Sequence, residues 1–153
     1  MKSLLVALLC IGLSAPALAA KPARATAPVL PLLLDAGGDV RPGSLLVVLF
    51  SLPDCHWCEE VRSHYLAPLA RDAGLVIREV DLNGRRPLTD FDGTVTTQAA
   101  FAKRLKVQFA PTVLFLDAQG RQVAAPLVGA GKADFYGAYL DEAIASGRRA
   151  ASK

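Results

Sequence analysis

Two cysteines, Cys55 and Cys58, stand shortly after an apolar run that ends at Phe50. The run, residues 45–50, contains branched aliphatic side chains and lies between turn signals, which predicts a central strand buried on both faces. After Cys55, apolar residues recur at spacings of three and four, a pattern typical of a helix with one apolar face. The sequence therefore predicts a strand, a short loop and a helix that begins at about Cys55. The apolar face of that helix comprises Cys58, Val61, Tyr65 and Leu69.

This position determines the chemistry expected of the cysteine pair. A thiolate, and not a thiol, attacks a disulfide, so a reactive cysteine needs a lowered pKa. The unpaired backbone N–H groups and the positive dipole at a helix N-terminus stabilise a thiolate. We therefore expect Cys55 to be the exposed nucleophile. Cys58, one turn along on the same face, can then resolve the mixed disulfide.

The first twenty residues have the pattern of a secretory signal peptide. A positive residue is followed by an apolar stretch over residues 4–13 and by a small-residue cleavage site, with the cut expected after Ala19 or Ala20. Export removes Cys10 and leaves the two motif cysteines in an oxidising compartment. A disulfide across so short a loop adds little stability, so we interpret it as reactive and not as structural.

The rest of the pattern predicts one α/β domain over residues 44–146. Residues 21–43 are expected to form a flexible lead-in with a first short element, and residues 147–153 a basic, frayed tail. Alternating units followed by an antiparallel hairpin predict a central mixed sheet with helices on both faces. Further strands are expected over 75–82, 112–116 and 122–128, and further helices from Thr96 or Thr97 and from about Lys132. Loops are expected at Gly37-Gly38 and over 85–93. An edge strand or short helix is expected over 29–34, and a kink or helix end at Pro68.

The arrangement resembles the thioredoxin superfamily, in which a CxxC motif lies where a long strand passes into a helix. Ala110-Pro111-Thr112, at the start of a later buried strand, is similar to the cis-proline segment of that family. The resemblance implies that Pro111 is cis and lies beside the cysteines, and that Ala110 offers its backbone to an extended substrate segment. The stretches 50–62 and 90–93 look like exported bacterial thioredoxin-fold proteins.

This resemblance implies a periplasmic thiol:disulfide oxidoreductase without a bound cofactor or metal. Its expected partners are thiols and disulfides of exported proteins and a membrane protein that transfers electrons, and we expect a monomer that acts as a reductant. His56 favours the opposite direction, because a cationic imidazole stabilises the Cys55 thiolate and makes the oxidised form an oxidant or isomerase. A solvent-facing histidine that only fills the turn is the alternative.

Other residues of the motif depart from thioredoxin. Trp57 is expected to be an exposed platform that touches substrate, with packing against the domain as the alternative. Leu49 stands where thioredoxin buries an acid, so Glu59, Glu60 or a water is left as proton acceptor for the resolving cysteine. Asp54 is expected to cap the helix or to lie beside the thiol.

Composition and spacing weigh against other functions. The formal charge is +3 without a dense Lys/Arg block, which gives no support for nucleic-acid binding. A c-type haem site needs histidine at the position of Glu59. A copper chaperone that uses Cys55, Cys58 and His56 or His64 is the main rival, since thiolates suit Cu(I), although His64 is expected on the helix surface. A non-catalytic adaptor is a further alternative.

Overall fold

The fold is taken from a computed structural model that describes residues 29–72, 75–131 and 133–153. The predicted signal peptide, its cleavage site and most of the lead-in lie outside these residues. Within the described part of the chain, no helix is both long and apolar enough to cross a membrane.

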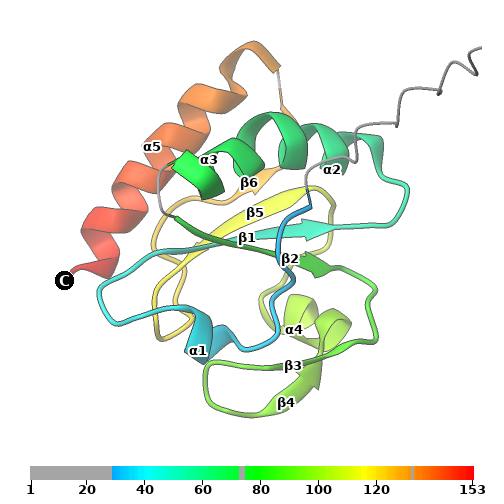
Figure 1. Cartoon of the computed structure of the whole chain (residues 1–153), viewed down its shortest axis with the longest axis vertical. Helices are drawn as coiled ribbons and strands as arrows, with labels where there is room; N and C mark the ends of the chain where they lie inside the picture. Colours follow the sequence, from blue (N-terminus) through cyan, green and yellow to red (C-terminus); the bar gives the residue numbers. More distant parts are fainter. Residues whose placement is uncertain (1–28, 73–74, 132) are drawn as a thin grey trace, which may run out of the picture.

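A four-stranded sheet with the order β2-β1-β5-β6 forms the centre of the fold (Figure 1). β1 (Leu46–Ser51) is parallel to β2 (Val76–Asp81) and antiparallel to β5 (Thr112–Leu116), which pairs with the short β6 (Leu127–Val128). Every residue of β1 is buried, because its side chains meet apolar groups on both faces of the sheet. The predicted α/β fold with a mixed central sheet is confirmed.

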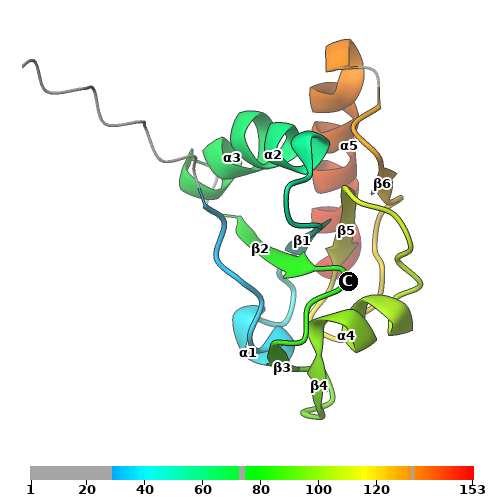
Figure 2. The same ribbon diagram turned by 90° about the vertical axis from the view of Figure 1, so that its right-hand side faces the viewer.

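Helices cover both faces of the sheet (Figure 2). Successive residues of a strand point to opposite faces, so Val47 and Leu49 pack in one core and Val48 and Phe50 in another. Full burial of an aliphatic side chain contributes about 1.5–3 kcal/mol, and the two cores therefore hold the end of β1 firmly in place. The first core is covered by the helix after the cysteines and by α5 (Ala133–Ala151), and the second by α1 (Ala36–Asp39) and α4 (Gln98–Arg104).

The helix after the cysteines changes its geometry along its length. α2 (His56–Glu60) passes into a π-helical segment, η1 (Val61–Leu66), and then into α3 (Ala67–Asp72). The irregularity expected at Pro68 takes this form. Proline has no N–H to donate to the preceding turn, and the chain is π-helical in the turn before it and then continues instead of ending.

The last helix, α5, runs further than predicted. Its buried face contains Tyr136, Leu140, Ala143 and Ile144, as expected. The expectation of a frayed tail over 147–153 is wrong for most of that stretch, because the helix extends to Ala151. Gly147 is buried, and a Cβ at this position would lie 2.9 Å from a methyl group of Leu45. This close packing holds the basic end of α5 against the start of β1.

Two segments predicted as loops contain regular structure. The expectation of a loop over 85–93 is wrong for residues 87–89, because β3 (Pro87–Thr89) pairs with β4 (Val95–Thr97) in a separate two-stranded sheet, and the rest of that stretch is loop and turn. The glycine pair expected in a loop lies inside α1. Asp35 caps this short helix by accepting a hydrogen bond from the Gly38 N–H at 2.9 Å, which stabilises a sequence of poor intrinsic helix propensity.

Three smaller expectations have different outcomes. Of the strand predicted over 122–128, only the two residues of β6 pair continuously with β5. The first short element forms one parallel bridge between Leu32 and Glu79, and so adds an edge contact to β2 and not a full strand. Thr97 caps α4 as predicted, since its hydroxyl oxygen accepts a hydrogen bond from the Ala100 N–H at 3.2 Å.

Candidate active site

The two motif cysteines form a disulfide at the N-terminus of α2. β1 ends at Ser51, a three-residue loop follows, and Cys55 is the N-cap of the helix. The Cα atoms of Cys55 and Cys58 are 5.2 Å apart. The Cys58 N–H donates a hydrogen bond to the Cys55 sulfur at 3.2 Å. One of the unpaired donors of the helix end is therefore directed at this sulfur.

The two cysteines differ in exposure. Cys58 is 1% exposed, whereas Cys55 is partly exposed. A partner can therefore reach Cys55 much more easily than Cys58. The prediction that Asp54 caps the helix is wrong, because the helix begins at His56 and Cys55 takes the cap position. Asp54 instead adopts a φ of 55° in the loop.

The start of β5 meets the same edge of the sheet. Phe50, near the end of β1, pairs with Thr112 in the antiparallel register. The Ala110–Pro111 segment that precedes Thr112 therefore lies beside the end of β1 that leads into the motif. Its peptide bond is cis, which is the form implied by the resemblance. The Pro111 carbonyl accepts a hydrogen bond from the Gly129 N–H at 2.7 Å, so the segment is tied to the residue after β6.

The family model of the thioredoxin-like domain matches residues 40–144. The chain belongs to this family. Among solved structures, it is similar to thioredoxin from Fasciola hepatica, with 20% identity and a TM-score of 0.52 over 76% of this chain and 97% of that one. It is also similar to the short form of thioredoxin f from spinach chloroplast, with 19% identity and a TM-score of 0.53 over 78% and 96% of the two chains. These likenesses show the fold. The comparison with curated protein sequences found no match.

The thioredoxin-like domain exposes both residues between its cysteines. Trp57 is 57% exposed, and His56 lies at the surface beside it. The two rings meet edge to face, with their centroids 5.2 Å apart. The exposure of Trp57 favours a platform for substrate over packing into the domain. The tuning role of His56 stays a prediction.

A buried cluster of charges lies beneath the helix that carries the cysteines. Glu79, on β2, is 7% exposed and accepts hydrogen bonds from the Ser51 hydroxyl at 2.5 Å and from the Arg62 Nε at 2.9 Å. The other guanidinium nitrogens of Arg62 contact Glu79 and Glu59. The hydrogen bond to Glu79 raises the pKa of Arg62, and burial opposes this effect. Arg62 thus connects the active-site helix to β2.

This cluster was not predicted from the sequence. In the sequence, the cluster is indicated by a pair of charged residues, Arg78 and Glu79, inside an otherwise mostly apolar strand. A charge that is buried in such a strand requires a partner. The partner, Arg62, is supplied by the packing of η1 over β2. In the parallel register Glu79 lies opposite Leu49, the fully buried residue at the position of the acid in thioredoxin. A buried carboxylate is therefore present in this region, on the neighbouring strand.

The two carboxylates considered as proton acceptors are held in other interactions. Glu59 contacts Arg62 and the Ser63 hydroxyl. Glu60 contacts His64, whose Nδ1 lies 2.7 Å from its carboxylate oxygen. The side chain of His64 is 65% exposed, as expected for a residue on the helix surface. Within the described residues, no group of three or more histidine, cysteine or acidic side chains is arranged to hold a metal ion.

A hollow of about 430 Å³ opens beside Cys55. Its charged lining residues are Asp54, Glu59 and Arg62. Arg62 already interacts with Glu59 and with the buried Glu79. A substrate segment that approaches Cys55 from this side therefore meets a surface with excess negative charge.

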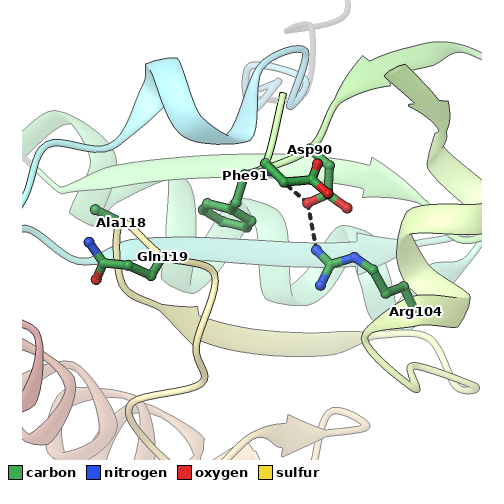
Figure 3. Close-up of a pocket in the computed structure, with 6 residues that line it drawn as sticks. Asp90, Phe91, Arg104, Ala118 and Gln119 are labelled. Atoms are coloured by element: carbon green, nitrogen blue, oxygen red, sulfur yellow. Dashed lines mark hydrogen bonds and ion pairs between the residues drawn. The ribbon is translucent and has the colours of Figure 1, made fainter. Parts of the chain in front are cut away.

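A second hollow, of about 320 Å³, is lined by Asp90, Phe91, Asp92, Arg104, Ala118 and Gln119 (Figure 3). Ala118, in its lining, follows β5 at the end where β5 pairs with the start of β1, away from the cysteines. Asp90 forms an ion pair with Arg104 at 2.6 Å and accepts a hydrogen bond from the Phe91 N–H at 2.7 Å. The ring of Phe91 packs with that of Phe101, with centroids 6.3 Å apart. Asp90 and Phe91 therefore contribute to packing between the small sheet and α4.

Proposed function

We propose that the chain is a thiol:disulfide oxidoreductase in which Cys55 attacks and Cys58 resolves. The observation that carries the proposal is the disulfide itself, which joins a partly exposed N-cap cysteine to a buried one within the first turn of α2. Family membership supports the same conclusion.

The reaction begins with the reduced pair. The Cys55 thiolate attacks one sulfur of a substrate disulfide, and the other substrate sulfur leaves as a thiolate. Cys58, once deprotonated, then attacks the Cys55 sulfur, and the second substrate sulfur leaves. Two electrons pass from the dithiol to the substrate, and the chain ends with the 55–58 disulfide. Every step is reversible, so the reduction potential of the pair determines the direction.

The local structure favours Cys55 as the attacking group. In the reduced state its thiolate can keep the hydrogen bond from the Cys58 N–H and lies at the positive end of the helix. Both effects lower the pKa of a thiol. Trp57 beside it offers an exposed apolar surface on which a substrate segment can lie.

The proposed setting is the periplasm, with exported proteins as substrates and a membrane protein as the electron donor. The signal-like pattern of the first twenty residues supports export, and the resemblance of the motif to exported thioredoxin-fold proteins supports the reducing direction. The chemistry uses the two sulfurs alone and requires no bound cofactor.

The first experiment is to measure the reduction potential of the 55–58 pair. The chain carrying Cys10→Ser is equilibrated with glutathione buffers, so that only two thiols report. A potential near −270 mV, about that of thioredoxin, is expected for a reductant. A potential near −120 mV makes the protein an oxidant and gives His56 the larger role.

Matched variants test whether Cys55 attacks the substrate and Cys58 resolves the mixed disulfide. Cys58→Ser is expected to accumulate a mixed disulfide with a peptide substrate, whereas Cys55→Ser is expected to accumulate none. If no 55–58 disulfide forms in any buffer, the oxidoreductase proposal fails. Titration of the reduced chain with Cu(I) then decides the copper-binding alternative.

A further inference from the structure

Two cationic side chains line a hollow beside α4. The hollow has a volume of about 600 Å³ and lies between the end of β2 and α4. Lys103 and Lys106 contribute to its lining, together with the amide side chains of Asn83 and Gln108. Its remaining lining residues are Leu82, Ala99, Ala102 and Val107, so none carries a negative charge.

Two arginines follow the lining residue Asn83 closely in the chain. Arg85 and Arg86 belong to the exposed loop between β2 and β3. Backbone hydrogen bonds hold that loop against the start of α4, from the Gln98 N–H to the Arg86 carbonyl at 3.1 Å and from the Ala99 N–H to the Gly84 carbonyl at 2.9 Å. We call Arg85, Arg86, Lys103 and Lys106 the basic patch.

The charges of the basic patch have no ion-pair partner among residues 29–72, 75–131 and 133–153. All four side chains belong to exposed residues. Of the two carboxylates next to the arginines in the sequence, Asp81 accepts a hydrogen bond from the Asn83 N–H and Asp90 forms an ion pair with Arg104. The hollow is lined by two lysines and by no acidic residue, which gives it a positive potential.

The basic patch lies at the same edge of the sheet as the disulfide. β1 and β2 are parallel, so their C-terminal ends meet at one edge (Figure 1). There the Leu82 N–H donates a hydrogen bond to the Ser51 carbonyl at 2.8 Å, just before the loop that leads to Cys55. On the other side of the hollow, Gln108 stands three residues before Pro111. A partner that fills the hollow is thus close to the redox pair.

The charges around Cys55 and those of the basic patch have opposite signs. The hollow beside Cys55 includes Asp54 and Glu59, with Arg62 already held by glutamates. An acidic segment is repelled at the first hollow and attracted at the second. Its favourable position is therefore on the α4 side of the disulfide.

We propose that the basic patch docks an acidic segment of the protein with which the cysteine pair exchanges electrons. This inference rests on the oxidoreductase function proposed above and adds the chemical class of the partner. The acidic residues of the partner lie some distance from its disulfide, so that one part occupies the hollow while the other reaches Cys55. Because the interaction is between exposed charges, it acts mainly on the rate of association and weakens with salt.

The test compares disulfide peptides that differ only in a flanking segment. A run of glutamates, glutamines or lysines is placed beyond a neutral spacer from the cystine, and each peptide is reduced by the reduced Cys10→Ser chain. At about 10 mM ionic strength, where the Debye length is about 30 Å, we expect the acidic peptide to have a kcat/KM about tenfold above that of the glutamine peptide. The advantage should shrink strongly at about 1 M salt, where the Debye length is about 3 Å.

The variants isolate the patch. Lys103→Glu/Lys106→Glu is expected to abolish the preference for the acidic peptide and to leave kcat/KM for the glutamine peptide within about twofold. The control is Arg41→Glu/Lys153→Glu, which changes the net charge equally at exposed positions, before β1 and at the chain end (Figure 1). This control should keep most of the preference.

The failure of docking and the failure of the proposed function give different results. If the acidic peptide is reduced no faster than the glutamine peptide, or if the control loses the preference as fully as the patch variant, docking at the basic patch is refuted and the oxidoreductase function stands. If no peptide is reduced by any form of the chain, the oxidoreductase function itself is refuted.

Discussion

Replacing Arg62 by methionine is expected to destabilise the fold much more than an ordinary ion-pair mutation. In the wild-type chain its guanidinium forms two hydrogen bonds with Glu79, and the two side chains are only 15% and 9% exposed. Methionine keeps the length of the aliphatic stem and removes both bonds. Glu79 then remains beneath the active-site helix with the Ser51 hydroxyl as its partner.

The magnitude follows from these contacts. Hydrogen bonds to charged groups contribute about 1.5–3 kcal/mol each, and loss of one partner of a buried pair costs about 3–5 kcal/mol. Residual exposure of Arg62 and protonation of the orphaned carboxylate reduce the loss, so we expect about 3 kcal/mol. In a domain of this size that loss lowers Tm by roughly 10 °C.

Urea unfolding of the oxidised chain at pH 7 measures this loss, and the same strand offers a control. Arg78, next to Glu79, points to the opposite face and pairs with Asp39 at 2.8 Å, with side-chain exposures of 24% and 25%. A more exposed pair contributes less, so Arg78→Met is expected to cost about 1 kcal/mol.

A double variant tests the coupling directly. Arg62→Met/Glu79→Met replaces the pair by apolar side chains of similar volume and should recover most of the stability lost in Arg62→Met, because no charge is then left buried. The reasoning is refuted if Arg62→Met costs no more than Arg78→Met. It is also refuted if the loss in the double variant equals the sum of the losses in the two single variants.

Three further predictions concern local structure, and urea unfolding checks each. Gly120→Ala should lower the free energy of unfolding by more than about 2 kcal/mol, because Gly120 has a φ of 73° and a Cβ there would clash with the Phe91 ring. An unchanged free energy of unfolding would contradict this clash. Thr97→Ala removes the N-cap of α4 and should cost about 1 kcal/mol, whereas Thr97→Ser should cost less. Burial alone raises the pKa of Asp117, but hydrogen bonds from Arg121 and Gln119 outweigh it and lower that pKa. Its stabilisation is therefore present above about pH 4 and lost as the pH falls through the lowered pKa, so Asp117→Asn should be destabilised at neutral pH and approach the wild type in acid.

The central strand and the redox motif could be predicted from the sequence because their determinants are local. A continuous apolar run specifies a strand buried on both faces, and the spacing of Cys58, Val61 and Tyr65 specifies a helix with one apolar side. The placement of Cys55 at the helix N-terminus follows from these two elements. Thr97 was found as a cap for the same reason, since capping involves residues three apart.

The expectations that failed depend on contacts and backbone geometry that residue type and spacing do not specify. The helix continues past Gly147 because Leu45 packs against it, and β3 forms because β4 lies opposite it. The cap of α2 is Cys55 and not Asp54, because the helix begins at His56 and Asp54 has a φ of 55° in the preceding loop.

The sequence by itself determined that two cysteines stand between a buried strand and a helix, which is enough to predict disulfide chemistry. Only the tertiary structure decided which charges surround that pair. Glu79 is 17 residues from Arg62 and 28 from Ser51 along the chain, and the packing of η1 over β2 brings the three together. Lys103 meets Asn83 at one hollow through the packing of α4 beside β2. Such pairings depend on which elements become neighbours in the fold, and residue type and local spacing do not specify this.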